Sequence, residues 1–254
     1  TQLASATVTI TSVVTGDVLG FATQNGITGV YTSSTGVLAL SGTATLAQYQ
    51  AALRSVTYNS TSEDSTVNSS RISRAITWVV IDANSDAVGA QTSLDVTSTV
   101  NLIAINDAPV VTAGAILAYT ENAAAAVIDA TITITDVDDA QLASATVTLI
   151  SGFVAGDILG FIDQNGIIGT YESINGVLSL VGSATKAQYQ AALRTVTYRS
   201  TSEDPTNNNT LANRSRTISW QVTDANSGGA GAAAALATET AEAEQLKRQV
   251  VEAR

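Results

Sequence analysis

The chain of 254 residues contains no histidine, no cysteine and no methionine. Without histidine and cysteine it cannot build a Ser-His-Asp or Cys-His nucleophile system, a disulfide framework, an iron–sulfur cluster or a typical zinc site. Aromatic residues make up only 5% of the chain and charged residues 13%. The chain also lacks an apolar run of about 18 residues, the length expected of a transmembrane helix.

Acidic residues dominate the little charge that is present. The chain has 22 Asp and Glu against 11 Lys and Arg, a net charge of −11. Such a chain repels phosphate and is a poor candidate for binding nucleic acid or an anionic membrane. Hydrophobic residues make up 45% of the chain, enough for a core. The metal chemistry left open is that of hard cations with oxygen ligands.

The sequence repeats itself once. Residues 2–10 recur as residues 141–149 with eight of nine identical, and residues 47–54 recur unchanged as residues 187–194. The period of about 140 residues is far longer than that of a solenoid repeat. Each copy is therefore predicted to be a whole domain in a tandem array.

Within each copy the pattern is that of β-structure. Residues 6–10 and 131–135 alternate polar or small residues with apolar ones, as in a strand with one buried face. Turn signals such as Asn-Gly separate further strand candidates. Residues 45–53 and their copy 185–193 are the exception, since a threonine N-cap and a Tyr–Leu pair four residues apart predict a short helix. Many short strands with one helix predict an all-β fold of β-sandwiches.

The two copies are not framed alike. Residues 110–139 precede the repeated motif in the second copy and have no counterpart in the first. Residues 89–103, a predicted final strand, have no counterpart in the second. We expect a piece of a longer array. It would consist of a first repeat without its opening strands (residues 1–103), a linker (104–109), a second repeat without its closing strand (110–227), and a Gly/Ala linker with a helical tail (228–254).

The tail is expected to be helical because it is rich in strong helix formers. Its acidic residues come first and Lys247 and Arg248 later, which suits the helix dipole. Leu236, Ala243 and Val250 lie seven residues apart. The tail is either an appended sequence forming a lone helix or a short coiled coil that joins copies of the chain.

One group of residues has metal-binding chemistry. It comprises Asn106 and Asp107 between the copies, then Glu121 within residues 119–122, and then Asp136, Asp138 and Asp139 after a predicted strand. Asp136 and Asp138 are two residues apart at a strand end, so both can project to one side. Calcium takes roughly six to eight oxygen ligands and tolerates irregular geometry. The alternative is turn chemistry, in which Asx residues cap turns and the acidic loop is merely solvated.

Several motifs together resemble cadherin-type repeats. They are residues 217–226 (TISWQVTDAN), residues 99–104 and the Asn-Asp-Ala-Pro run at residues 106–109. They also resemble the cadherin-like and chondroitin-sulfate-proteoglycan-like repeats of large bacterial surface adhesins of the repeats-in-toxin kind. The resemblance covers residues 1–227 and implies Ig-like Greek-key sandwiches with calcium bound between successive domains.

Carried over residue by residue, the resemblance implies that calcium is held by Asn106, Asp107, Glu121, Asp136 and Asp138, with Asp139 as an addition. The chain departs from the cadherin pattern at position 104, where an alanine replaces an acidic residue, and it lacks the Asp-Arg-Glu motif within the domain. Fewer ions or weaker binding are therefore expected. Two further aspartates match a position that is structural in the family and are expected in turns: Asp82 and Asp224.

Other conspicuous residues have structural interpretations. The two tryptophans lie on apolar strands and are expected in the core: Trp78 and Trp220. Two Gly-Asp pairs are expected in turns: residues 16–17 and 156–157. Two Tyr/Arg pairs are expected to fasten the short helices to the sandwiches: Tyr49 with Arg54, and Tyr189 with Arg194.

These observations favour a module without enzymatic activity, because no spacing places two carboxylates on opposite sides of a cleft. We expect a calcium-rigidified stalk or spacer of a bacterial surface adhesin, secreted or at the cell surface, that serves cell adhesion or biofilm formation. Its partners would be neighbouring repeats of the same chain, without nucleic acid or membrane insertion. The alternatives are a glycan- or protein-binding adhesive domain, or a subunit that self-associates through open sheet edges or the C-terminal helix.

Overall fold

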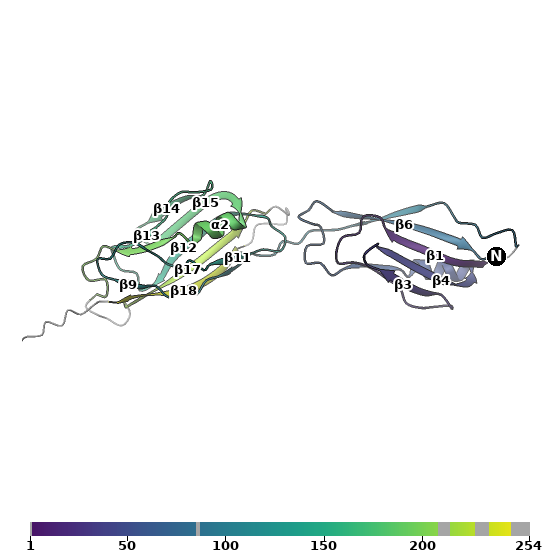
Figure 1. Cartoon of the computed structure of the whole chain (residues 1–254), viewed down its shortest axis with the longest axis horizontal. Helices are drawn as coiled ribbons and strands as arrows, with labels where there is room; N and C mark the ends of the chain where they lie inside the picture. Colours follow the sequence, from purple (N-terminus) through teal and green to yellow (C-terminus); the bar gives the residue numbers. More distant parts are fainter. Residues whose placement is uncertain (1, 85–86, 208–213, 227–233, 245–254) are drawn as a thin grey trace, which may run out of the picture. The chain divides into compact units, whose positions relative to one another are not determined.

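The computed structural model describes residues 2–84, 87–207, 214–226 and 234–244 of the chain, the last range as backbone only (Figure 1). The chain divides into two compact units, Thr1–Ile105 (unit 1) and Asn106–Arg254 (unit 2). Each unit has its own hydrophobic core. Among the described residues, no helix combines the length and the apolar character needed to cross a membrane.

Unit 1 is a small β-sandwich with one helix. Its main sheet has the strand order β3-β4-β1-β6-β7, and β2 pairs with β5 in a second sheet. Leu19 of β2 shares a core cluster with Val8 of β1 and Leu38 of β4, so the core lies between the sheets. The elements are β1 (Gln2–Ile10), β2 (Asp17–Gly20), β3 (Thr28–Thr32), β4 (Val37–Thr45), α1 (Leu46–Arg54), β5 (Thr57–Ser60), β6 (Ser73–Asp82) and β7 (Val96–Asn101).

Unit 2 repeats this sandwich and adds strands to it. Its sheets have the strand orders β14-β15-β12-β17-β18-β9, β10-β16-β13 and β11-β8. The elements are β8 (Val110–Thr112), β9 (Ala118–Thr120), β10 (Ala126–Val127), β11 (Thr133–Thr135), β12 (Gln141–Ser151), β13 (Asp157–Gly160), β14 (Ile168–Glu172), β15 (Val177–Thr185), α2 (Lys186–Leu193), β16 (Thr197–Ser200), β17 (Ser215–Asp224) and β18 (Ala234–Glu244).

The repeated sequence folds in the same way twice. β1 pairs with β4 and β6, and β12 pairs in the same antiparallel manner with β15 and β17. The predicted period-two alternation is confirmed, since Ala6, Val8 and Ile10 are buried while the residues between them are not. The predicted short helices are also confirmed. Each begins after a threonine N-cap that forms a capping box with a glutamine three residues on.

A buried ion pair anchors the second sheet of each unit. In unit 2, Arg216 Nε lies 2.6 Å from Asp157 Oδ2, and both side chains are fully buried. The Tyr198 hydroxyl donates to Asp157 Oδ1 at 2.7 Å. Burial, and then the charge of Asp157, raise the pKa of Tyr198, so its hydroxyl stays a neutral donor. The Gly-Asp pairs expected only in turns therefore also carry a buried charge network, and unit 1 has the same one at Asp17 and Arg74.

The tyrosines fasten the helices as expected. The Tyr49 hydroxyl donates to the Gly42 carbonyl at 2.8 Å, and the Tyr189 hydroxyl donates to the matching carbonyl in unit 2. Arg194 Nε donates to the Ile132 carbonyl at 2.8 Å. The expectation is wrong for Arg54, which is exposed. The segment that Arg194 binds in unit 2 has no counterpart in the described part of unit 1, so Arg54 has no such backbone carbonyl to bind.

The prediction of a helical C-terminal tail is wrong where the structure describes the tail. Residues 234–244 form β18, which runs antiparallel to β17 over residues 215–223 and parallel to β9. β18 occupies the place in unit 2 that β7 has in unit 1. Helix propensity amounts to tenths of a kcal/mol per residue, whereas the edge of β17 offers a full row of unpaired backbone groups. Residues 228–233 and 245–254, and with them most of the expected coiled coil, lie outside the described residues.

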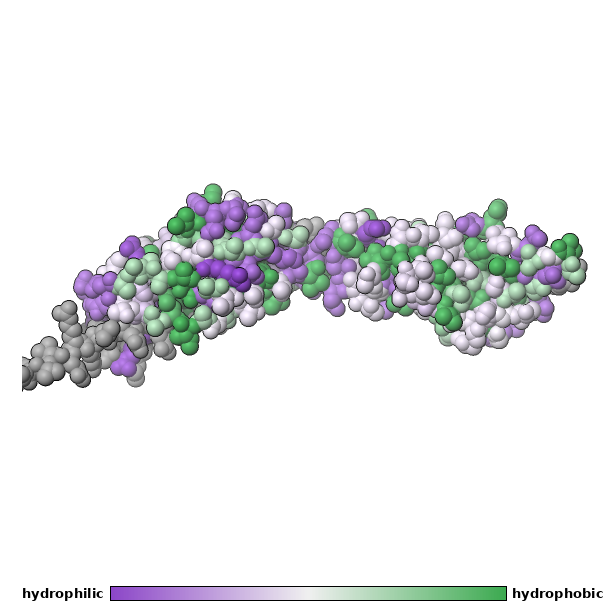
Figure 2. Space-filling model, viewed as in Figure 1, coloured by the Kyte–Doolittle hydropathy of each residue, from purple (hydrophilic) through white to green (hydrophobic). Residues whose placement is uncertain are grey.

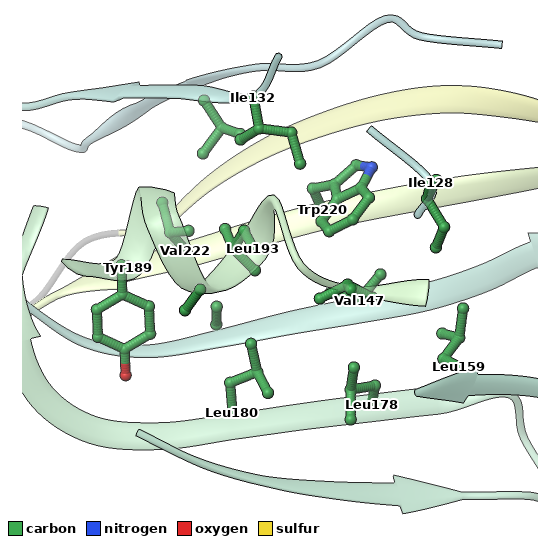
Figure 3. Close-up of a cluster of buried hydrophobic side chains, with 14 of the residues drawn as sticks. Ile128, Ile132, Val147, Leu159, Leu178, Leu180, Tyr189, Leu193, Trp220 and Val222 are labelled. Carbon is green, nitrogen blue, oxygen red and sulfur yellow. The ribbon is translucent and has the colours of Figure 1, made fainter. Parts of the chain in front are cut away.

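The core of unit 2 draws on the main sheet, α2 and the segment that precedes β12. Figure 3 shows Trp220 and Val222 of β17 with Val147 of β12 and Leu193 of α2, and with Ile132 from the preceding segment. On the outside, Figure 2 shows hydrophobic and hydrophilic residues interspersed over both units. This is the surface expected of a chain in which only 13% of the residues are charged.

Candidate metal centre

Three aspartates gather in the loop between β11 and β12. Asp136, Asp138 and Asp139 each offer a carboxylate oxygen, and these oxygens all lie within 4.8 Å of one another. Asp138 is 6% exposed and Asp139 is 1% exposed, while Asp136 is half-buried. Such burial argues against a merely solvated loop, because carboxylates are rarely buried unless they are paired or coordinate a metal.

Asp136 builds the loop that holds the group. Its Oδ1 accepts hydrogen bonds from the backbone amides of Asp138 at 3.1 Å and Asp139 at 2.7 Å. This is an Asx turn, the alternative that the sequence left open. The turn uses only one carboxylate oxygen, however. Oδ2 of Asp136 is left for another partner, so turn chemistry and metal binding are compatible on this side chain.

Asn106 and Asp107 join this group through hydrogen bonds. The backbone amide of Asp107 donates to Asp138 Oδ2 at 3.0 Å. The Asn106 side-chain amide donates from Nδ2 to Asp224 Oδ2 at 2.8 Å. The segment at which the chain enters unit 2 is thereby tied both to the acidic loop and to the end of β17.

Asp224 is a member of the group that sequence reasoning missed. It is fully buried at the end of β17, and its Oδ1 accepts from the Asn226 amide at 2.9 Å, as expected of a turn residue. Its other oxygen faces Asn106, some 118 positions away in the sequence. Asp82, its counterpart in unit 1, makes the same turn contact with Asn84 but is only half-buried. Sequence alone contains no signal that separates these two aspartates.

Several buried oxygens of the group have no hydrogen-bond partner among the described residues. They are Asn106 Oδ1, Asp136 Oδ2 and Asp138 Oδ1. Native structures leave few buried polar atoms unsatisfied, and each one calls for an explanation such as an ion or water. Three such oxygens on residues linked to one another form a donor set suited to a hard cation.

The electrostatics of the loop also favour a cation. Burial raises the pKa of Asp136, and the neighbouring carboxylate of Asp138 adds to the effect, although the backbone amides of Asp138 and Asp139 oppose it. Within the described residues no lysine or arginine forms an ion pair with Asp136 or Asp138. The Lys186 ammonium instead donates to the backbone carbonyl of Asp136 at 2.6 Å. No basic side chain among the described residues therefore neutralises the carboxylates of Asp136 and Asp138 by direct pairing.

Glu121 lies away from this group. It follows β9, which pairs with Glu242–Glu244 of β18, and Glu242 lies opposite Ser215 at the start of β17. Asp224 is at the other end of β17, and ten strand residues span about 30 Å. Figure 1 shows β9 and β11 at opposite ends of the unit. The structure thus brings together four of the six residues singled out, Asn106, Asp136, Asp138 and Asp139, together with Asp224. Asp107 contacts the group only through its backbone amide, and its side chain is exposed.

Comparisons with known proteins yield one curated relative and a set of solved structures, but no family model matches the chain. Halomucin of Haloquadratum walsbyi (strain DSM 16790 / HBSQ001) is 31% identical over 157 residues, which is 50% of this chain. The chain spans only 2% of the length of halomucin.

Cadherin extracellular regions are among the similar solved structures. A protocadherin gammaB7 EC3-6 cis-dimer structure aligns with 95% of this chain and 51% of its own, at 13% identity and a TM-score of 0.35. The human CDH23 EC21-23 structure aligns with 94% of this chain and 62% of its own, at 13% identity and a TM-score of 0.33. The mouse protocadherin-24 EC1-3 structure aligns with 92% of this chain and 65% of its own, at 13% identity and a TM-score of 0.32. The two sandwiches are established by the strand pairing itself and not by these alignments.

Proposed function

We propose that the chain is a calcium-stabilised repeat module of a surface-exposed or secreted adhesive protein, in which it serves as stalk or spacer without enzymatic activity. The observation that carries the proposal is the buried acidic loop of unit 2, in which two oxygens have no hydrogen-bond partner among the described residues: Asp136 Oδ2 and Asp138 Oδ1. The repetition of one sandwich in two units supports a structural role, because a spacer is extended by adding copies.

Calcium fits this donor set better than the other common cations. All the candidate ligands are oxygens, from carboxylates and from the side-chain amide of Asn106. Zinc and copper prefer imidazole or thiolate, and the chain has neither. Magnesium demands a near-ideal octahedron and keeps most of its waters, whereas calcium accepts an irregular set of protein oxygens at about 2.3–2.6 Å.

The ion would act by joining segments that are distant in the sequence. Its ligands would come from the entry segment at Asn106, from the loop at Asp136, Asp138 and Asp139, and from Asp224 at the end of β17. Without the ion these carboxylates repel one another in a partly dry environment. With the ion the repulsion is replaced by attraction, so the entry segment and the first strands of unit 2 are held more firmly.

The finer part of the proposal concerns the parent protein. The cadherin-like motifs at residues 99–109 and 217–226 support an array of such units in a bacterial surface adhesin that serves cell adhesion. The halomucin match supports a surface repeat protein more broadly. In such an array the neighbouring repeats of the same chain are the first partners of each unit.

A calcium titration of the full chain tests the proposal. Thermal melts and isothermal titration calorimetry would compare calcium with a chelator. Calcium that binds only the folded state adds about 2.7 kcal/mol at a free concentration about a hundredfold above Kd. The double variant Asp136→Asn/Asp138→Asn should lose the response, whereas Glu121→Gln should keep it. Superimposable melts with calcium and chelator, together with no heat of binding, would refute the metal site.

A further inference from the structure

A single lysine distinguishes the helix of unit 2 from that of unit 1. Residues 44–54 and residues 184–194 have the same sequence except at the first helical position, which is Leu46 in α1 and Lys186 in α2. Lys186 is also the only lysine among the described residues. The helix does not need a charge at this position, since α1 forms with a leucine there and with the same capping box.

The electrostatics of the helix itself disfavour a lysine at its first position. The N-terminus of a helix carries a partial positive charge, so a cation in the first turn is repelled. No acidic residue in the first turn of α2 compensates for this repulsion. The favourable interactions of the Lys186 ammonium therefore lie outside the helix.

Lys186 holds the acidic loop at both of its ends. Its ammonium donates to the backbone carbonyl of Asp136 at 2.6 Å, and the side chain is half-buried. Its backbone amide donates to the carbonyl of Ala140 at 3.4 Å. The first residue of α2 thus contacts the start and the end of residues 136–140.

The ammonium lies near the carboxylates of the loop but forms no ion pair with Asp136 or Asp138 within the described residues. The carbonyl and the carboxylate of Asp136 belong to one residue, so covalent geometry keeps them within about 5 Å of each other. The ammonium is therefore within about 8 Å of this carboxylate, which is the Debye length at physiological ionic strength. At this range its charge acts on the carboxylates and on any cation that lies among them.

We propose that Lys186 is a built-in counter-charge that sets the calcium affinity of the acidic loop. Without metal it offsets the repulsion among the carboxylates and holds the loop through the Asp136 carbonyl. The same charge repels a divalent cation entering the loop, so it weakens calcium binding. The inference rests on the proposed calcium site and assigns it to the weak range of extracellular calcium modules, with a Kd of about 10⁻⁴–10⁻³ M.

The variant Lys186→Met tests both effects in the full chain, because it removes the charge and keeps an unbranched stem. Calorimetry should show that calcium binds about tenfold more tightly than to the unsubstituted chain. Urea unfolding in chelator should show a lower midpoint for unit 2. Lys186→Leu, which copies the residue of α1, is a second neutral variant and should behave alike. Lys186→Arg keeps the charge and should resemble the unsubstituted chain in both measurements.

Arg199→Met is the matched control, since it removes the same charge far from the loop. Arg199 is exposed and follows Tyr198, whose hydroxyl binds Asp157, the ion-pair partner of Arg216 near the start of β17. The acidic loop is joined to the other end of β17, at Asp224, through the entry segment of unit 2. These two places are about 26 Å apart along the strand. The control should therefore change neither the calcium affinity nor the midpoint in chelator.

The gain in affinity should also depend on the charge of the ion. Coulomb repulsion grows in proportion to that charge, so a tenfold gain for calcium corresponds to a gain of about thirtyfold for trivalent terbium. Salt at about 1 M shortens the Debye length to about 3 Å and should reduce both gains. Equal gains for the two ions at every salt concentration would overturn an electrostatic role.

The remaining outcomes separate this inference from the calcium site itself. If the unsubstituted chain binds calcium and Lys186→Met binds it equally or more weakly, the inference is overturned and the site stands. An unchanged midpoint of Lys186→Met in chelator would overturn it too, because the lysine would then not stabilise the metal-free loop. An absence of calcium binding by the unsubstituted chain and by all variants would instead refute the metal site on which the inference rests.

Discussion

Trp78 and Trp220 hold the same place in the two units, opposite Val8 and Val147 on the central strands. Trp220 is completely buried, whereas Trp78 is half-buried. Trp78 Nε1 donates to Ser98 Oγ at 2.8 Å, while Trp220 Nε1 has no hydrogen-bond partner among the described residues. Corresponding strands with the same tryptophan thus lie in different environments because different segments flank them.

The difference shows how the sandwich is assembled. The repeated part provides four strands of the main sheet, one helix and a buried ion pair, and this part is present in both units. The segment before the repeat covers the second face and brings the acidic loop. Unit 2 therefore combines a fully covered core with a candidate metal centre, whereas matching side chains such as Trp78 and Val80 are only half-buried in the described part of unit 1.

The largest effect should follow from breaking the feature that the units share. Asp157→Ala leaves the fully buried Arg216 without its carboxylate and should lower the free energy of unfolding of unit 2 by about 3–5 kcal/mol. Asp17→Ala should destabilise unit 1 through the same loss at Arg74. Urea unfolding followed by circular dichroism measures both. A cost below about 1 kcal/mol in both variants would mean that the ion pairs are not structural anchors.

The next effect separates two aspartates that look alike in sequence. Asp224→Asn removes a charge from the proposed metal site and should weaken calcium binding about tenfold or more, equivalent to about 1.4 kcal/mol or more. Asp82→Asn makes the same change in unit 1 and should leave the affinity unaltered. Calorimetric titration of both variants tests this prediction, because an equal loss of calcium affinity in both would mean that calcium binds elsewhere.

A third effect depends on pH and belongs to unit 2 alone. Burial of Asp129 opposes ionisation, but hydrogen bonds from the Thr131 side chain and from the amides of Thr131, Gly114 and Ala115 outweigh it and lower the pKa to about 2. The unfolded state therefore binds the proton more readily than the folded state. The resulting stabilisation is fully present above about pH 4 and is lost as the pH falls through about 2.

The variant Asp129→Asn should reveal this contribution directly. It should lower the stability of unit 2 by about 2 kcal/mol at pH 7 and by progressively less in acid. Urea unfolding at a series of pH values measures the trend. A stability difference that stays constant down to pH 2 would contradict the assigned role of the carboxylate.

The smallest effect compares two arginines at the ends of the helices. Arg194→Ala removes the hydrogen bond to the Ile132 carbonyl and should cost about 1–2 kcal/mol. Arg54→Ala should change stability by less than about 0.5 kcal/mol, because Arg54 is exposed. Thermal denaturation of both variants tests this difference. A similar loss at the two positions would show that Arg54 has a partner after all.

Much of the fold could be predicted from local patterns. The alternation along residues 6–10 and the threonine caps of both helices act over a few residues, so their outcome is written in the nearby sequence. The acidic loop could also be predicted from the sequence, because Asp136, Asp138 and Asp139 are near neighbours and a turn suffices to bring them together. Asn106 and Asp107 were grouped with this loop because they also carry side-chain oxygens, and the resemblance then implied that they act as ligands.

The remaining features depend on contacts between distant residues. Residues 234–244 have the composition of a helix, yet β17 offers an edge whose backbone groups a strand can pair. Glu121 belongs to the expected ligand set by motif, but the pairing of β9 with β18 puts it at the far end of the sheet. Asp224 has a turn motif identical to that of Asp82, and the two differ in the structure by the contact with Asn106 and the full burial of Asp224.

Periodicity, capping and turn formation are local physical effects, so the amino-acid sequence was enough to predict one sandwich built twice, with short capped helices and an acidic loop. Which acidic groups meet and which strand closes unit 2 became known only from the assembled fold. Those outcomes depend on which segments pair with a strand edge or cover a sheet face. They cannot be derived from local patterns, because burial and backbone pairing are properties of the assembled sheets. The absence of histidine and cysteine limited the chemistry to oxygen ligands, and the fold brought a set of those oxygens together.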